Sequence, residues 1–556
     1  RYVLLFGDGS YDPKNRVTGN NNLIPTFQSS ESLNTTKSYV TDDYFGIMAD
    51  EAGQESNGKI DLGIGRLPVS DTVEAKVIVD KIIRYSSFRY PVQGDSRNTI
   101  TFVADDENNN LHLNQAEELT AIVANKYPLF NVNKIYFDAY PLVEIPGGSR
   151  FPDANTAINK AVSKGSLIVN YTGHGGETGW SYEQALTTAD INSWSNADKL
   201  PVFVTATCEF SRFDNPERFT AGEMVILHPN GGAIALYSTT RLAYAGLNIL
   251  LDTCFFHHLM DKASDGQYVK MGDLIRISKN NNNNNFQLRN FVLLGDPAQG
   301  IGFSDYNIRT VSVNGNPVNP PDTAMGLSTV TVKGIIEDIA GQKVSSFDGI
   351  ANCKVYDKPV TLTTLGNSPG SNGSYPQDFR IQNSILFQGD VPVKSGEFQF
   401  SFVLPKGTSL QFGNGKLSYY AYNGEADAAG YFNQIIIGGR DNSVNPENQG
   451  PEIGLWLDDR GFVSGDKTRK SPILMADLYD TNGINSFGLG IGHEIEAVLD
   501  NDRSHSMVLN DSFAPWFNNY TRGTVTCQLS DLASGHHTLS LKAWDLFDNS
   551  SVREIS

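Results

Sequence analysis

A histidine and a cysteine each follow an apolar run in the first half of the sequence. His174 lies in SLIVNYTGHGGETGW, directly after a run typical of a buried strand, and Cys208 follows the next such run in PVFVTATCEF. If these runs form adjacent parallel strands, both side chains lie over one crevice at the carboxyl edge of a sheet, where open α/β sheets place their sites. The pattern therefore predicts a catalytic pair.

A thiol next to an imidazole is the chemistry of nucleophilic cysteine enzymes. The thiolate attacks a carbonyl carbon, while a neighbouring imidazolium favours the thiolate and later protonates the leaving amine. Gly175 and Cys208 both follow an expected strand, and their backbone amides are candidates to bind the developing oxyanion. The alternative is that Cys208 is a small buried hydrophobe and His174 a turn residue, because each type is common in that role when it stands alone.

The elements that would position this pair lie before residue 304, where the pattern of the sequence changes. Before it, short apolar runs alternate with helical patterns, which predicts an α/β domain over 1–303 with a mostly parallel sheet flanked by helices. After it, period-2 segments separated by turn residues predict two immunoglobulin-like β-sandwich modules, 304–445 and 446–556. The expected strands of the first domain are 2–6, 99–104, 166–171, 202–206, 233–237 and 291–294. The expected helices start near residue 71 and cover 153–164, 219–227 and 247–261.

Composition and charge exclude several classes of protein. The 556 residues carry a formal charge of −19, which argues against a nucleic-acid partner because phosphate binding requires clustered Lys and Arg. The four cysteines lie far apart and form no CxxC pair, so neither a zinc site nor a disulfide framework is indicated. No apolar run approaches the roughly 18–20 residues of a membrane helix. The sequence opens inside an expected strand, so we expect a preceding portion to be missing.

The sequence as far as residue 302 resembles the gingipain-type, caspase-like cysteine peptidases. The likeness is carried by the GHG-x-E-T motif, the histidine-to-cysteine spacing, the segments DDYFG and GIGRLPV, and the closing LLGDP. It implies a caspase-like fold in which His174 and Cys208 are the catalytic dyad and Gly175 is the oxyanion-hole glycine. The third catalytic acid of the family follows an earlier strand, where this chain has FVADDENNN. That position implies Asp106, with Asp105 as its neighbour and a solvated acidic loop as the alternative.

The same resemblance gives two candidates for substrate binding. Arginine-specific members of the family hold a basic substrate side chain with an acidic residue at the start of the next helix. Here that place is occupied by His112 or Asn114, and no carboxylate follows until Glu117, so the resemblance does not imply arginine specificity. Tyr244 lies where the family has an aromatic wall of the substrate pocket, and a packed surface tyrosine is the alternative.

Within the family, the chain looks most like the members that remove C-terminal signals in the type IX secretion system and act as sortases. That likeness implies that Cys208 cleaves a C-terminal targeting domain from secreted cargo and transfers the cargo to an amine of anionic lipopolysaccharide. It also implies an outer-membrane secretion-system partner and a location on the outer face of the outer membrane. Two alternatives stay open: an endopeptidase that only hydrolyses, and an inert surface scaffold with adhesive β modules.

Four acidic residues in Gly- and Asn-rich turns are the remaining candidates for ion binding. They are Asp8, Asp12, Asp42 and Asp43. Carboxylate oxygens are ligands that calcium prefers, so calcium as a structural ion is one reading. The segment has no EF-hand pattern, and turn chemistry is the favoured alternative. No other cofactor is expected, and no metal is assigned to the catalytic pair.

Overall fold

The computed structural model describes residues 1–556 except 31–33, 35–37, 51–57, 88–95, 283–285, 320–321, 445–447 and 489–491. The described chain divides into two compact units. The first contains Arg1–Phe303 together with Thr361–Ile381, and the second contains Ser304–Val360 and Gln382–Ser556. The expected change at residue 304 therefore coincides with the start of the second unit, while the expected boundary at 445/446 lies outside the described residues.

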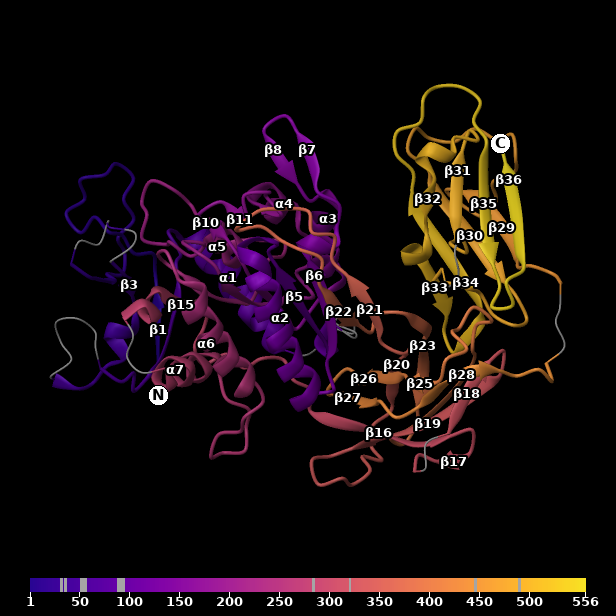
Figure 1. The fold of residues 1–556 in the computed structure, drawn as a ribbon, viewed down its shortest axis with the longest axis horizontal. Helices are drawn as coiled ribbons and strands as arrows, with labels where there is room; N and C mark the ends of the chain where they lie inside the picture. The colour runs from indigo at the N-terminus through magenta and orange to yellow at the C-terminus, as the bar shows by residue number, and fades with distance from the viewer. Residues whose placement is uncertain are drawn as a thin grey trace. The chain divides into compact units, whose positions relative to one another are not determined.

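The first unit is built on an eight-stranded sheet in the order β1-β4-β15-β14-β13-β9-β5-β6 (Figure 1). Neighbouring strands from β14 through β13, β9 and β5 to β6 are all parallel, as are β1 and β4, whereas β15 is antiparallel to β14. The expected α/β fold with a mostly parallel sheet is confirmed. The strands are β1 (Tyr2–Phe6), β4 (Gly63–Leu67), β5 (Thr99–Ala104), β6 (Asn131–Tyr136), β9 (Ile168–Thr172), β13 (Val202–Ala206), β14 (Ala235–Thr239) and β15 (Phe291–Leu294).

Helices cover both faces of this sheet. One apolar core contains side chains of α1, α3, α4 and α5, and the other contains side chains of α2, α6 and α7. In β13, Phe203 faces the first core and Val202 and Val204 face the second, so successive apolar residues are buried on both faces of the strand. The helices are α1 (Thr72–Ser86), α2 (Glu107–Lys126), α3 (Pro152–Lys164), α4 (Thr188–Ser193), α5 (Ala221–Leu227), α6 (Ala245–His257) and α7 (Met271–Asn281). Among the described residues, none of the helices has the length and apolarity that crossing a membrane requires.

The second unit contains two sandwich-like modules, each with its own apolar core. In the first, a sheet in the order β23-β20-β26-β27-β16-β19-β24 and a sheet in the order β18-β28-β25 contribute to one core. In the second, sheets β29-β30-β34-β33 and β32-β31-β35-β36 do the same. The strands of the first module are β16 (Tyr306–Val313), β17 (Asn316–Pro317), β18 (Thr323–Gly326), β19 (Thr329–Glu337), β20 (Gly349–Tyr356), β23 (Ile385–Val393), β24 (Glu397–Val403), β25 (Gly413–Asn414), β26 (Lys416–Tyr422), β27 (Asp427–Phe432) and β28 (Ile436–Arg440). Those of the second are β29 (Glu452–Leu457), β30 (Ile473–Tyr479), β31 (Glu496–Leu499), β32 (Met507–Val508), β33 (Phe513–Trp516), β34 (Asn519–Gln528), β35 (Leu539–Trp544) and β36 (Ser550–Ile555).

The segment Thr361–Ile381, which we call the inserted hairpin, belongs to the first unit although its neighbours in sequence belong to the second. It contains β22 (Asp378–Ile381) and all but the first residue of β21 (Val360–Thr363), the strand with which β22 pairs. β22 lies beside β6 (Figure 1). Phe379 packs in a small apolar cluster with Tyr136, whose ring centroid is 5.0 Å away. The sequence pattern assigned this whole stretch to a β module, because only long-range contacts distinguish it.

A buried ion pair ties together the loops that follow β13 and β14 at the carboxyl edge of the sheet. Arg241 and Asp214 are both 0% exposed, and the guanidinium Nη1 and Nη2 lie 2.8 and 2.7 Å from the two carboxylate oxygens. The Glu209 amide also donates to the Arg241 carbonyl over 3.3 Å. The segment that contains Cys208 is therefore anchored by a bidentate contact that water does not reach.

Replacing Arg241 by Met should lower the free energy of unfolding by about 3–5 kcal/mol, because an unpaired carboxylate would remain buried. The double variant Arg241→Met, Asp214→Leu should recover much of that loss, since it removes the buried charge altogether. Urea unfolding followed by circular dichroism measures both. If the double variant is as unstable as the single variant, the unpaired buried carboxylate is not the cause of the lost stability.

Candidate active site

The catalytic candidates lie at the carboxyl ends of three adjacent parallel strands. In the β9–β13 pair, Thr172 is opposite Ala206, and on the other side of β9 the same Thr172 is opposite Ala104 of β5. His174 and Cys208 each follow their paired residue by two positions, so both leave the sheet at the same edge. The predicted adjacency of the two strands is confirmed.

His174 is held by a buried carboxylate. Its ring Nδ1 lies 2.8 Å from Oδ2 of Asp105, and its backbone amide donates to the same oxygen over 2.8 Å. The hydroxyl of Tyr171 donates to the His174 carbonyl over 2.7 Å. A Cβ at Gly173 would lie 2.6 Å from the Asp105 Cβ and would also meet the Tyr171 hydroxyl, so the close approach requires glycine.

The acid that contacts the imidazole is Asp105, which corrects the sequence-based choice of Asp106. The carboxylate of Asp106 accepts a hydrogen bond from the Ser368 hydroxyl of the inserted hairpin over 2.7 Å. Adjacent residues after a strand point in different directions, and the sequence FVADDENNN does not reveal which of the two acids faces the histidine. The hydrogen bond to His174 makes Asp105 the candidate for the third catalytic acid.

The electrostatics of the two neighbouring acids differ. Burial alone would raise the pKa of Asp105. Hydrogen bonds from His174 and the charges of His112 and His174 lower this pKa instead, so the carboxylate stays ionised. The hydrogen bond to Asp105 in turn raises the pKa of His174. Burial, with the Asp105 charge next to it, raises the pKa of Asp106 to about 7. Asp105 is thus the permanent anion that orients the imidazole and stabilises its protonated form.

The Cys208 thiol rests against backbone. Its Sγ accepts from the Ala243 amide over 3.4 Å and lies 3.6 Å from the Ala243 carbonyl oxygen. Burial raises the pKa of Cys208 above its usual value, which favours the neutral thiol. Among the described residues, no hydrogen bond joins this thiol to His174. Catalytic hydrogen bonds of free enzymes commonly form only in the substrate complex, so this geometry describes a resting site.

The second ring nitrogen of His174 is occupied by Asn108, a residue that the sequence analysis did not single out. The Nδ2 of Asn108 lies 3.2 Å from Nε2 of His174 and 3.1 Å from Nε2 of His112. His112 is buried, and its ring lies edge-on to the His174 ring with centroids 5.2 Å apart. The structure therefore places His112 against the catalytic histidine, and a role in substrate binding stays a prediction.

Gly175 lies where an oxyanion-binding amide is expected. It pairs with Trp180 in a small sheet of β10 (Gly175–Gly176), β11 (Gly179–Trp180) and β12 (Leu186–Thr187). A Cβ on Gly175 would lie 2.5 Å from Oγ1 of Thr207, the residue before Cys208. This backbone therefore passes directly beside the nucleophile segment. The oxyanion role itself stays a prediction.

Comparison with known proteins agrees with this geometry. Residues 1–301, more than half of the chain, match peptidase family C25. The chain belongs to this family. The Lys-gingipain of Porphyromonas gingivalis is 25% identical over 181 residues, which are 33% of this chain and 10% of that protein. The chain thus spans about a tenth of the length of the curated relatives that it matches.

Two solved structures are also similar to this C25 family member. Dimeric latent PorU from Porphyromonas gingivalis is 25% identical with a TM-score of 0.36, and the match covers 100% of this chain and 47% of that one. The Arg-specific cysteine proteinase gingipain R is 15% identical with a TM-score of 0.42, and the match covers 79% of this chain and 84% of that one. With such TM-scores, these structures add no argument to the family assignment.

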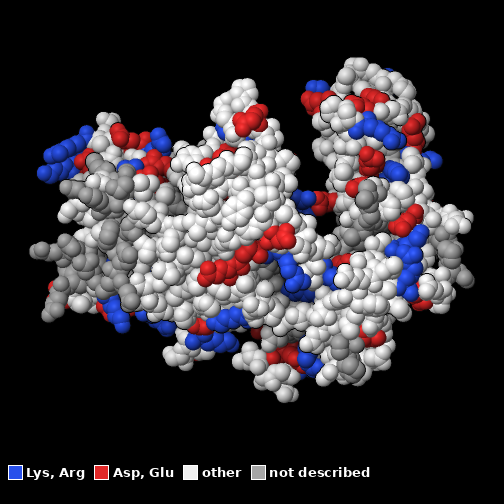
Figure 2. Space-filling view, in the orientation of Figure 1, with Lys and Arg blue, Asp and Glu red and all other residues white. Residues whose placement is uncertain are grey.

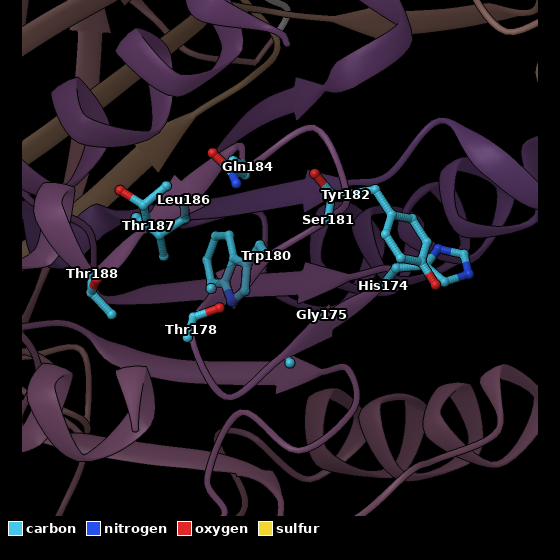
Figure 3. A pocket seen from close by; sticks show the side chains of 12 residues that line it. His174, Gly175, Thr178, Trp180, Ser181, Tyr182, Gln184, Leu186, Thr187 and Thr188 are labelled. Carbon is cyan, nitrogen blue, oxygen red and sulfur yellow. The ribbon is translucent and has the colours of Figure 1, made fainter. Parts of the chain in front are cut away.

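A cavity of about 380 Å³ opens beside the histidine of this C25 chain (Figure 3). Tyr182, 73% exposed, lies next to His174 with ring centroids 5.7 Å apart, and Trp180 lies deeper between the small strands. Tyr244 is not among the lining residues. It is 56% exposed at the start of α6, next to the Ala243 backbone that contacts the thiol. A substrate-binding role for Tyr244 stays a prediction. The lining residues are His174, Gly175, Gly176, Thr178, Gly179, Trp180, Ser181, Tyr182, Gln184, Leu186, Thr187 and Thr188.

The acidic residues proposed as calcium ligands make other contacts. Asp42 pairs with Arg66, and Asp43 pairs with Lys279 and Arg289 in buried ion pairs. Asp8 and Asp12 accept hydrogen bonds from backbone amides of their own turns. Asp8 and Asp12 thus make the contacts of turn residues, while Asp42 and Asp43 neutralise buried cations, and calcium stays a prediction. Around Asp105, ligand-type atoms also lie close together in two groups, one with His112 and His174 and one with Asp106 and Glu183, and we assign no metal to them.

The two acids should differ sharply in their effect on catalysis. Asp105→Asn should lower kcat/KM on a peptide that the wild type cleaves by about 10²–10⁴-fold, because the amide cannot support the imidazolium. Asp106→Asn is the matched control and should stay within about tenfold of wild type, because its carboxylate does not touch the ring. The opposite order of effects would return the role to Asp106.

Asp106 should also make stability depend on pH. Its pKa is about 7 in the folded state against 3.8 as the ordinary value, so the folded state binds the extra proton between these limits. The stability that this group contributes is present below about pH 4 and is lost as the pH rises through about 7. Asp106→Asn should therefore raise the free energy of unfolding by about 1–3 kcal/mol at pH 8 and have little effect at pH 4. Urea unfolding at the two pH values measures this, and an equal effect at both would contradict it.

Proposed function

We propose that this chain is a cell-surface cysteine peptidase that transfers the acyl group of its cleaved substrate to an amine. Such an enzyme is a transpeptidase. The observation that carries the proposal is that Cys208 and the Asp105–His174 pair follow neighbouring parallel strands at one edge of the sheet. A protein of this fold without catalytic activity would not need a buried carboxylate that is hydrogen-bonded to the histidine, with a cysteine after the neighbouring strand. The family assignment supports peptide-bond chemistry at this site.

The first half-reaction forms a thioester. Nε2 of His174 takes the proton of the Cys208 thiol, and Sγ attacks the carbonyl carbon of the scissile peptide bond. The amides of Gly175 and Cys208 bind the oxyanion of the tetrahedral intermediate. The intermediate collapses as the C–N bond breaks and His174 gives its proton to the leaving amine. Asp105 holds the Nδ1–H throughout and stabilises the imidazolium.

The second half-reaction decides between transfer and hydrolysis. An acceptor amine attacks the thioester carbon, His174 takes its proton, and the C–S bond breaks as Sγ recovers a proton. The products are a new amide bond and the free thiol. Water at the same position would give a carboxylic acid instead. The choice therefore rests on which nucleophile reaches the carbonyl beside His174.

The substrates and the location follow from the sequence resemblance to the sortases of type IX secretion. We propose secreted cargo with a C-terminal targeting domain as acyl donor, an amine of anionic lipopolysaccharide as acceptor, and an outer-membrane secretion-system protein as partner. On the face shown in Figure 2, Lys and Arg lie in small groups among Asp and Glu. Because the net charge is −19, long-range attraction would not favour an anionic acceptor. Selection of the amine would then depend on contacts at the site.

The proposal is tested with cargo that carries its targeting domain, incubated with an excess of a small primary amine. Wild type should release the targeting domain and leave an amide adduct at the new carboxyl end of the cargo, detected by mass spectrometry. Cys208→Ala should form no product, because the thioester cannot form. His174→Ala is expected to lose about 10²–10⁴-fold in rate. A free acid as the sole product would support the plain endopeptidase, and no cleavage by wild type would support the inert scaffold.

A further inference from the structure

Asn108, which contacts the catalytic histidine, lies in an uncommon stretch of backbone. Asn108, Asn109 and Asn110 have φ angles of 59°, 55° and 60°, all in the left-handed region. For residues with a side chain this region costs roughly 1–2 kcal/mol per residue, and asparagine tolerates it better than most. Three such residues in succession persist only where the surroundings fix them.

The inserted hairpin supplies those contacts. The amide of Asn108 donates to the Asn372 carbonyl over 2.8 Å, and the amide of Asn109 donates to the Gly373 carbonyl over 2.8 Å. The side-chain amide of Asn372 donates to Oδ1 of Asn108 over 2.9 Å. Backbone and side chain of Asn108 are therefore both held by one turn of the hairpin.

The third residue of the stretch is fixed in the same way. The buried side chain of Asn110 donates to the Tyr375 carbonyl over 2.8 Å and to Oε1 of Gln377 over 2.9 Å. Its Oδ1 accepts from the Tyr375 amide over 3.1 Å. Together with the Ser368–Asp106 hydrogen bond, these contacts make the hairpin the support of the whole segment that follows β5.

In this structure Oδ1 of Asn108 accepts from Asn372, and Nδ2 lies toward the Nε2 atoms of His174 and His112. A donor at Nε2 requires a lone pair there, so this contact fits the neutral imidazole with its proton on Nδ1 toward Asp105. Hydrogen bonding to the neutral form of a group disfavours its charged form.

We propose that Asn108, held by Asn372 and Gly373, is a positioning residue that occupies Nε2 of His174 and keeps the dyad as neutral thiol and neutral imidazole until substrate displaces it. This inference rests on the proposed function, since it concerns the same proton. Nε2 must be free to take the thiol proton, so the Asn108 contact has to break before Cys208 attacks. The inserted hairpin then controls how readily the site becomes reactive.

The other groups around His174 act in the opposite direction. Asp105 contacts Nδ1, Oε2 of Glu107 lies 3.7 Å from the same nitrogen, and Glu183 adds a further negative charge nearby. All three favour the imidazolium. His112 is the remaining titratable neighbour, and burial lowers its pKa, so near neutral pH it adds little positive charge. The Asn108 donor is therefore a specific contact that opposes charging of His174.

The test measures how the alkylation rate of Cys208 by iodoacetamide depends on pH in the full chain. Asn108→Gly removes the side-chain amide, and glycine accepts the left-handed backbone. The alkylation rate near pH 6.5 should rise about threefold to tenfold, which corresponds to the loss of one hydrogen bond. Asn108→Asp replaces the donor by a charged acceptor and should move the thiol titration to lower pH by about one unit. Asn372→Ala should act in the same direction as Asn108→Gly, but less strongly.

Asn109→Gly is the matched control, because Asn109 has the same conformation and its side chain is exposed. It should leave the pH profile unchanged. If Asn108→Gly and Asn108→Asp react no faster than wild type while His174→Ala suppresses the reaction, the inference is overturned and the proposed function stands. If alkylation does not depend on His174 at all, the proposed function fails first. Near-UV circular dichroism verifies that each variant is folded, and Asn108→Asp retains the test should Asn108→Gly be unstable.

Discussion

The site depends on one buried hydrogen bond, between the Asp105 carboxylate and Nδ1 of His174. An ionised carboxylate taken out of water is costly unless it is paired, and here the imidazole ring and the His174 amide both satisfy it. That requirement explains Gly173, where any side chain would push the two apart. It also fixes the ring so that Nε2 points away from the acid, toward Asn108.

The two groups that we propose to act in turn at that nitrogen come from different parts of the chain. Cys208 is delivered by β13, while Asn108 is held by a hairpin that lies far later in the sequence. The thiol meanwhile is hydrogen-bonded to the Ala243 backbone. In the proposed resting state both reactants are uncharged. On that proposal, the hydrogen bonds of Asn108 to the ring and of Ala243 to the thiol break before Cys208 reacts.

The fold could be predicted from the sequence where one local period dominates. Buried strands read as largely apolar runs, and the strands 99–104, 202–206 and 291–294 were expected with the bounds that the structure gives. The inserted hairpin could not be predicted, because its short strands have the same composition as the β modules on either side. Only its packing on β6 and its contacts with the segment after β5 assign it to the first unit.

The sequence alone indicated that a histidine and a cysteine follow two consecutive apolar runs, because the apolar period is a local property. The tertiary structure decided that the two strands are neighbours in the sheet. The sequence also determined the change to β modules near residue 304. Tertiary structure decided which of two consecutive aspartates supports the histidine, since side chains after a strand end take their direction from packing. It likewise decided that Asn108 contacts the ring, because left-handed backbone at three asparagines depends on hydrogen bonds from residues more than two hundred positions away.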